Sequence, residues 1–320
     1  MAATDSGNFI GTAPGAKYLL LRSEDAETEQ LIEEVNWSVA AEDADSFGVD
    51  LITTSLGYTV FDDKSMGHSY AELDGHTTLI TRAAETAVAK GIFVVCSAGN
   101  DGESPWKHIG CPADAEHALA VGAVGYNRKL AGFSSYGPSP DGRIKPDVCA
   151  MGYYAAVQSP YGGVSLENGT SFSAPITAGM VACLLQAHPE KTPAAIFDAI
   201  LKSADRHDMP DSYYGYGIPD FYMAHLLLQG KSTNTADELL DVTFNASDKI
   251  VTFAVKSAST QQFRFKILDD AGNILRTGTQ ACSANKIMRY YLDGIQLPAS
   301  DKGYAFILLN EKNESFIRLF

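Results

Sequence analysis

Short apolar runs alternate with longer amphipathic segments up to about residue 230. Each run is ended by polar or glycine residues, which predicts a strand buried on both faces of a parallel sheet. The runs are residues 16–21, 50–55, 92–96 and 118–123. Strands that alternate with helices predict an α/β fold, doubly wound, with a mainly parallel sheet and helices on both faces.

Two of the intervening segments have helical periodicity. Apolar residues recur near one face in residues 28–47 and again in residues 77–90, so each segment is expected to pack that face against the sheet. The face residues are Leu31, Val35, Val39 and Phe47 in the first segment and Leu79, Ala83, Ala87 and Val88 in the second.

The pattern changes after residue 230. Residues 230–236 are polar and aperiodic, which is typical of a linker. The apolar period then becomes two, which predicts β-strands. The segments concerned are residues 263–267 and Tyr304, Phe306 and Leu308, with turn-like sequences at 270–273 and 310–313. We therefore expect two domains, residues 1–230 with the α/β fold and residues 231–320 as a small antiparallel β-sandwich.

Acidic residues outnumber basic ones. Asp and Glu total 39 and Lys and Arg total 24, a formal net charge of −15, which argues against nucleic acid or an anionic membrane surface as a partner. The longest apolar stretch, Ala174 to Leu185, is shorter than the roughly 20 residues of a spanning helix, so we expect no membrane span. Residues 1–5 have no signal-peptide character, so the protein is expected to be cytosolic or to have lost its natural start.

Neither cysteines nor acidic residues form a recognisable metal or disulfide motif. The five cysteines are far apart in sequence and include no CxxC pair, which favours buried free thiols. The acidic residues Asp43, Asp45, Asp62 and Asp63 lack EF-hand spacing and are expected at the surface, so a structural calcium ion has no motif to support it.

The segment Asn168 to Pro175, with the sequence NGTSFSAP, carries the sharpest chemical signal. A glycine turn precedes a helix, and Pro175 is expected in its first turn. Ser171 at this junction would expose its hydroxyl beside an unpaired N–H at the positive end of the helix dipole. An acyl-transfer nucleophile needs this environment, although an ordinary serine N-cap has the same sequence appearance.

A second segment, Ser97-Ala98-Gly99-Asn100, directly follows a predicted buried strand. An amide at the carboxyl end of such a strand points into the crevice where α/β sheets bind ligands. Asn100 could therefore donate to an oxyanion, or it could be a turn asparagine in a left-handed conformation.

Residues from about Gly11 to Gly230 resemble the subtilisin family of serine proteases. Gly169 to Pro175 is similar to the family's GTSxxxP nucleophile motif, Ser97 to Asn100 to its oxyanion segment, and Ser55-Leu56-Gly57 to its substrate-binding strand. Supporting matches occur in family order at residues 11–16, 112–114, 133–137 and 145–148.

The resemblance implies a serine endopeptidase that hydrolyses extended polypeptides without a cofactor. It implies that Ser171 attacks the peptide carbonyl, and that Asn100 and the Ser171 N–H hold the oxyanion. Ser55, Leu56 and Gly57 would pair with the substrate backbone, and Ser97, Ala98 and Gly99 would line the pocket for the residue before the cleaved bond. The resemblance also implies a secreted or cell-surface protein.

The aspartate and histidine of a subtilisin-type triad have no match in this chain. The resemblance places both before Gly11, in a strand ending in Asp-Thr/Ser-Gly and in a His-Gly-Thr helix. Asp5-Ser6-Gly7 spells the first motif but is expected to be a turn, since no buried strand precedes it. His76 in Gly75-His76-Thr77 is expected at the surface near a helix start.

We therefore expect residues 1–320 alone to be inactive. In one interpretation they are part of an active protease whose missing N-terminal segment, or a propeptide, is a partner. In the other the chain is a pseudoprotease, a peptide-binding module that does not cut. Residues 263–320 somewhat resemble the C-terminal sorting domains of type IX secretion substrates, with an accessory β-sandwich as the alternative.

Overall fold

The computed structural model describes residues 1–5 and 9–229, and seven strands between residues 241 and 319. The chain divides into two compact units, Met1–Lys231 and Ser232–Phe320. The predicted linker at 230–236 lies outside the described residues, as do the predicted turns at 270–273 and 310–313.

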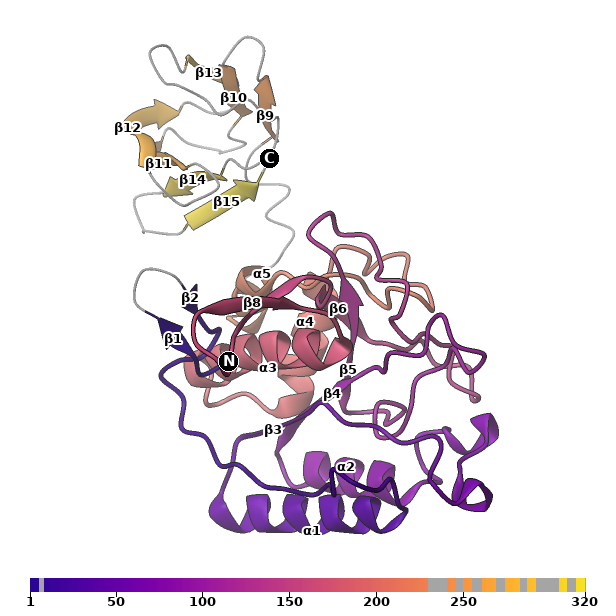
Figure 1. The fold of residues 1–320 in the computed structure, drawn as a ribbon. Helices are drawn as coiled ribbons and strands as arrows, with labels where there is room; N and C mark the ends of the chain where they lie inside the picture. The colour runs from indigo at the N-terminus through magenta and orange to yellow at the C-terminus, as the bar shows by residue number, and fades with distance from the viewer. Residues whose placement is uncertain are drawn as a thin grey trace. The chain divides into compact units, whose positions relative to one another are not determined.

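The first unit is built on a parallel four-stranded sheet in the order β3-β4-β5-β6 (Figure 1). Apolar and β-branched residues form these strands, and three of the four predicted runs are confirmed as strands or parts of them. The strands are β3 (Leu51–Thr54), β4 (Phe93–Ser97), β5 (Leu119–Val124) and β6 (Val148–Met151).

Helices cover both faces of this sheet, as the doubly wound pattern predicts. Helices α1 and α2 contact each other on one face, and α3 contacts all four strands on the other, where α4 and α5 pack beside it (Figure 1). The helices are α1 (Ile32–Phe47), α2 (Leu79–Ala89), α3 (Thr170–Ala187), α4 (Pro193–Ser203) and α5 (Phe221–Leu228).

Strand β4 separates two hydrophobic cores. Its side chains alternate, so Val94 and Cys96 join the core under α1 and α2, whereas Phe93 and Val95 join the core under α3. All five β4 residues are buried. The residue that follows β4 is therefore held by packing on both sides of the sheet.

The predicted strand at residues 16–21 is wrong. This segment has no regular structure, and Leu20 is 88% exposed, with Leu19 and Leu21 also exposed. A strand forms only where a neighbouring strand completes its hydrogen bonds, and no described strand pairs with this segment. Its apolar run is therefore not sufficient to define a strand.

The predicted core-facing side of α1 is also wrong. Leu31, Val35, Val39 and Phe47 are exposed, and α1 instead buries Trp37 with alanines and two glutamates. Trp37 donates its indole N–H to Thr54 Oγ1 at 3.1 Å, which fixes α1 against the end of β3. Helix α1 thus presents an apolar surface that no described residue covers.

Short elements complete the first unit. An antiparallel hairpin leads into α3, a second hairpin lies at the N-terminus, and two 3₁₀ helices precede α2. These elements are β7 (Ala155–Gln158), β8 (Val164–Glu167), β1 (Thr4–Asp5), β2 (Phe9–Ile10), η1 (Lys64–Met66) and η2 (Tyr70–Glu72).

The second unit consists of two antiparallel sheets, which agrees with the predicted antiparallel pairing. One has the order β13-β10-β9 and the other β12-β11-β14-β15. Its strands are β9 (Asp241–Asn245), β10 (Ile250–Ala254), β11 (Gln261–Leu268), β12 (Ile274–Cys282), β13 (Ile287–Tyr291), β14 (Ala305–Leu309) and β15 (Ser315–Leu319). Its description as a β-sandwich stays a prediction.

Among the described helices, α3 is long and apolar enough to span a membrane by length and composition. It contacts strands β3, β4, β5 and β6, and its buried residues include Ala174, Ala178 and Val181. The core helix of a globular domain has the same properties.

A buried ion pair joins the ends of the central strands. Lys145 Nζ lies 2.7 Å from Asp147 Oδ2, both side chains are buried, and Asp147 also accepts the N–H of Ala120. We expect Asp147→Ala to lower the free energy of unfolding by about 3–5 kcal/mol, because it leaves the Lys145 charge buried and unpaired. Urea unfolding followed by the fluorescence of Trp37 and Trp106, both in the first unit, measures this loss.

The matched control removes both charges. Lys145→Met combined with Asp147→Leu should recover part of the stability lost in Asp147→Ala. Equal losses in the single and the double variant would show that the charge left on Lys145 is not the cause.

Candidate active site

Helix α3 begins with the residues of the predicted nucleophile segment. Gly169 precedes it with φ +151°, a conformation that favours glycine, and Ser171 is the second helical residue. The N–H of Ser171 has no hydrogen-bond partner among the described residues, and no acidic residue lies in the first turn of α3. The positive end of the helix dipole is therefore uncompensated beside the Ser171 hydroxyl.

Asn100 lies directly against this helix start. Its side-chain oxygen accepts the N–H of Thr170 at 2.9 Å and the Thr170 hydroxyl at 3.1 Å. The Thr170 Oγ1 atom also accepts the N–H of Gly99 at 3.2 Å. Ser171 and Asn100, which are far apart in sequence, are thus brought together through Thr170.

This arrangement leaves two hydrogen-bond donors for a ligand. Because its oxygen is occupied by Thr170, Asn100 retains its NH₂ group, which makes no hydrogen bond among the described residues. The second donor is the N–H of Ser171. Two N–H donors beside a hydroxyl can stabilise the negative charge that develops on an attacked carbonyl oxygen.

A reciprocal contact ties Ser171 to the segment that follows β3. Ser55 Oγ donates to the Ser171 carbonyl at 3.0 Å, and Ser171 Oγ donates to the Ser55 carbonyl at 3.3 Å.

Pro175 explains why the Ser171 carbonyl is available to Ser55. Proline has no N–H, so the usual helical bond from residue 175 to the carbonyl of residue 171 cannot form. Pro175 is the sixth residue of α3, so its predicted place in the first turn is wrong.

The predicted substrate-binding residues lie at the carboxyl ends of β3 and β4. Ser55 and Gly57 are exposed and Leu56 is half-buried. Ala98 is fully buried within the core and Ser97 is 7% exposed. Of these three residues, Gly99 is therefore the one that a ligand could contact at the surface.

Gly99 is required by its backbone and by a close neighbour. Its φ of +109° is strained for other residues, and a Cβ atom would lie 2.8 Å from Ser135 Oγ. Ser135 donates its N–H to the Gly99 carbonyl at 3.0 Å and accepts the N–H of Asp101 at 2.9 Å. Thr170 and Ser135, which hold the backbone and side chain of residues 99–101, were not predicted as site residues. Thr170 belongs to the nucleophile motif, and this membership could have identified it.

No histidine of the described residues is hydrogen-bonded to Ser171. The described hydrogen bond of Ser171 Oγ goes to the Ser55 carbonyl. His76 is exposed in a turn before α2, where Asp74 accepts its N–H, as expected for a surface histidine. Asp5 lies in β1, paired with Phe9 outside the parallel sheet, and the rest of the expected turn, Ser6 and Gly7, lies outside the described residues.

Three of the described cysteine thiols, those of Cys96, Cys111 and Cys149, are poor candidates for a nucleophile. Burial raises the pKa of Cys96, Cys111 and Cys149 well above the usual range of a thiol, so all three are protonated at neutral pH. These three confirm the prediction of buried free thiols, whereas Cys183 is free but exposed.

Comparison with known proteins agrees with this geometry. The profile of the Subtilase family, Peptidase_S8, matches residues 1–217. Serine protease AprX of Bacillus subtilis strain 168 is 29% identical over 242 residues, which cover 67% of this chain and 52% of that protein. Subtilisin NAT of Bacillus subtilis subsp. natto is 31% identical over 222 residues, which cover 68% of this chain and 51% of that protein.

Solved structures share the fold. The patellamide maturation protease PatA matches with a TM-score of 0.50 at 25% identity, covering 62% of this chain and 70% of that one. MycP1 with its N-terminal propeptide removed matches with a TM-score of 0.53 at 23% identity, covering 70% of this chain and 75% of that one. The chain spans about half the length of the curated relatives it matches. Since the family profile covers most of the first unit, the chain belongs to the subtilase family of serine peptidases.

Proposed function

We propose that Ser171 is the nucleophile of a serine endopeptidase. Its hydroxyl oxygen attacks the carbonyl carbon of a peptide bond, and the N–H of Ser171 with the NH₂ group of Asn100 stabilises the oxyanion. The amine leaves with a proton, and water then hydrolyses the acyl-enzyme. The observation that supports this proposal best is the contact of Asn100 with Thr170, the residue directly before Ser171.

We propose that the substrate is an extended polypeptide. Ser55, Leu56 and Gly57 follow β3 and approach Ser171 through the reciprocal Ser55 contact. An extended chain that pairs with the backbone of this segment would present its carbonyl to Ser171. Gly99 would line the pocket for the residue before the cleaved bond, with Ser97 and Ala98 forming its buried support. This chemistry needs no metal or organic cofactor.

We propose that the general base is supplied by polypeptide outside these 320 residues. A subtilase triad needs a histidine that takes the Ser171 proton and an aspartate that orients it, and no described histidine is bonded to Ser171. Two features of the first unit support added polypeptide. Strand β3 is an edge of the sheet, and residues 19–21 and α1 expose apolar side chains. An N-terminal segment or a propeptide fits these surfaces.

The second candidate function is peptide binding without cleavage. The observation in its favour is again the missing histidine partner of Ser171. Such a protein would hold extended chains at Ser55–Gly57 and release them unchanged.

The proposed location is outside the cell or at its surface, because the curated relatives include subtilisins.

The second unit is proposed as a sorting domain for export, with an accessory structural domain as the alternative. A sorting domain should be removable without loss of folding of residues 1–231, whereas loss of folding on its deletion would favour the structural role.

We expect purified residues 1–320 to show no turnover of a chromogenic peptide above that of Ser171→Ala. Loss of the triad base lowers turnover by about 10⁶-fold in subtilisin, and we expect the same order here. The rate of chromophore release is the measurement. Ser165→Ala, at a partly buried serine of β8, is the matched control.

Turnover that Ser171→Ala abolishes and Ser165→Ala preserves would show that the base lies within these residues. The fluorescence anisotropy of a labelled extended peptide measures its binding, and together with the cleavage assay it distinguishes the endopeptidase from the peptide-binding module. Binding without cleavage, even in a longer natural chain that carries the aspartate and histidine motifs, would favour the binding module.

In that longer natural chain, Asn100→Ala should lower kcat by about 10²–10³-fold, the loss known for the oxyanion asparagine of subtilisin. KM should change little, because the amide acts on the transition state. Asn127→Ala, at an exposed turn asparagine, is the control and should leave both constants unchanged. A rise in KM with kcat preserved would contradict the assigned role of Asn100.

A further inference from the structure

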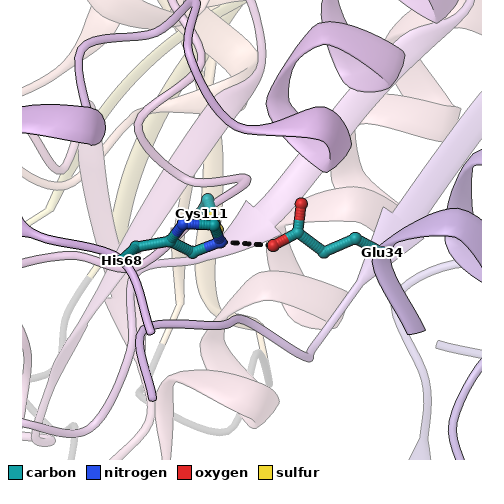
Figure 2. A group of neighbouring side chains, drawn as sticks. All are labelled: Glu34, His68 and Cys111. Atoms are coloured by element: carbon teal, nitrogen blue, oxygen red, sulfur yellow. Dashed lines mark hydrogen bonds and ion pairs between the residues drawn. The ribbon is translucent and has the colours of Figure 1, made fainter. Parts of the chain in front are cut away.

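Three potential metal ligands converge on the α1 side of the first unit. Glu34 comes from α1, His68 from the loop between η1 and η2, and Cys111 from the segment before β5 (Figure 2). Their ligand atoms, a carboxylate oxygen, a ring nitrogen and a thiol sulfur, all lie within 4.8 Å of one another. The three residues are distant in sequence and share nothing with the site at Ser171.

The cluster is withdrawn from solvent. The side chains of Glu34 and His68 are 0% and 12% exposed, and Cys111 is fully buried. His68 Nε2 donates a short hydrogen bond to one carboxylate oxygen of Glu34, and the other oxygen accepts the N–H of Ile80 at 3.1 Å. The Cys111 thiol donates to the Tyr58 carbonyl at 3.2 Å. Glu34 and Cys111 are thus each held by a backbone group outside the cluster, as ligands of metal sites are.

Negative charge surrounds the cluster. The hydrogen bond to Glu34 raises the pKa of His68 despite its burial, and Glu34, Glu72 and Asp114 act in the same direction. Burial raises the pKa of the Cys111 thiol, and Glu34 and Asp114 raise it further. The cluster therefore lies among negatively charged groups, which favour a bound cation.

We propose that Glu34, His68 and Cys111 bind a zinc ion. Zinc accepts carboxylate, imidazole and thiolate ligands together, whereas calcium and magnesium take oxygen ligands. On binding, His68 and Cys111 each release one proton to solvent, and Zn²⁺ takes their place.

The site would support the substrate segment. Cys111 pairs through its backbone with Tyr58, with N–H to carbonyl distances of 2.9 and 3.2 Å. Tyr58 directly follows Gly57, the last residue of the proposed substrate-binding segment. A metal that joins Cys111 to α1 would hold this segment against the core. A water molecule is the expected fourth ligand, entering beside the partly exposed His68.

The test uses residues 1–320 after dialysis against a chelator. Titration with Zn²⁺ should give one bound ion per chain and a rise in Tm, and Co²⁺ should give a thiolate charge-transfer band. Cys111→Ala should abolish the band, and Glu34→Gln should weaken zinc binding by more than the roughly 10–100-fold typical of an outer-shell change. Affinity should fall as the pH is lowered, because protons compete for His68 and Cys111.

Matched controls remove a cysteine and a histidine elsewhere. Cys183→Ala, at an exposed thiol, and His117→Ala, at an exposed histidine paired with Glu85, should bind zinc as the unmodified chain does. Circular dichroism and tryptophan fluorescence verify that each variant is folded. No charge-transfer band with Co²⁺, or equal zinc affinity in folded Cys111→Ala, would overturn the proposal and leave the cluster as a buried ion pair beside a thiol.

Discussion

The contact between Asn100 and Thr170 is the interaction on which the candidate active site depends. Its two hydrogen bonds join the carboxyl end of β4 to the amino end of α3. Strand β4 is packed on both sides by the two cores, so Asn100 closely follows a strand whose five residues are all buried. Thr170 transmits that position to Ser171, the next residue. The active-site geometry therefore follows from the packing of the central strand rather than from the loops around it.

The first unit also has two surfaces that no described residue covers, the exposed apolar side chains of α1 and the unpaired edge of β3. Apolar patches rimmed by polar residues mark interaction surfaces, and an unpaired strand edge invites a further strand. Here the edge strand β3 leads into Ser55, which contacts Ser171. Residues 16–21, although apolar, adopt no strand because no described strand pairs with them.

Sequence patterns predicted the parts of the protein that local chemistry determines. The run at residues 92–96 was predicted correctly because a strand paired and covered on both sides is apolar throughout, and the glycine before Ser171 predicted a helix start because its backbone conformation is local. The face of α1 was predicted wrongly, since Glu34 is buried by hydrogen bonds to His68 and Ile80, which lie far along the chain. The Glu34, His68 and Cys111 cluster was missed for the same reason: its members are scattered, so no spacing motif exists to reveal them.

Pro175 has a consequence for how rigidly Ser171 is held. In an ordinary helix the first carbonyls are bound from within, so the first turn moves with the rest of the helix. Proline removes one of those internal bonds, and Ser55 replaces it from another element. The first turn of α3 is therefore anchored laterally, to the strand that would carry the substrate. A shift of that strand on binding would displace the Ser171 carbonyl with it, so that nucleophile and substrate keep their mutual alignment.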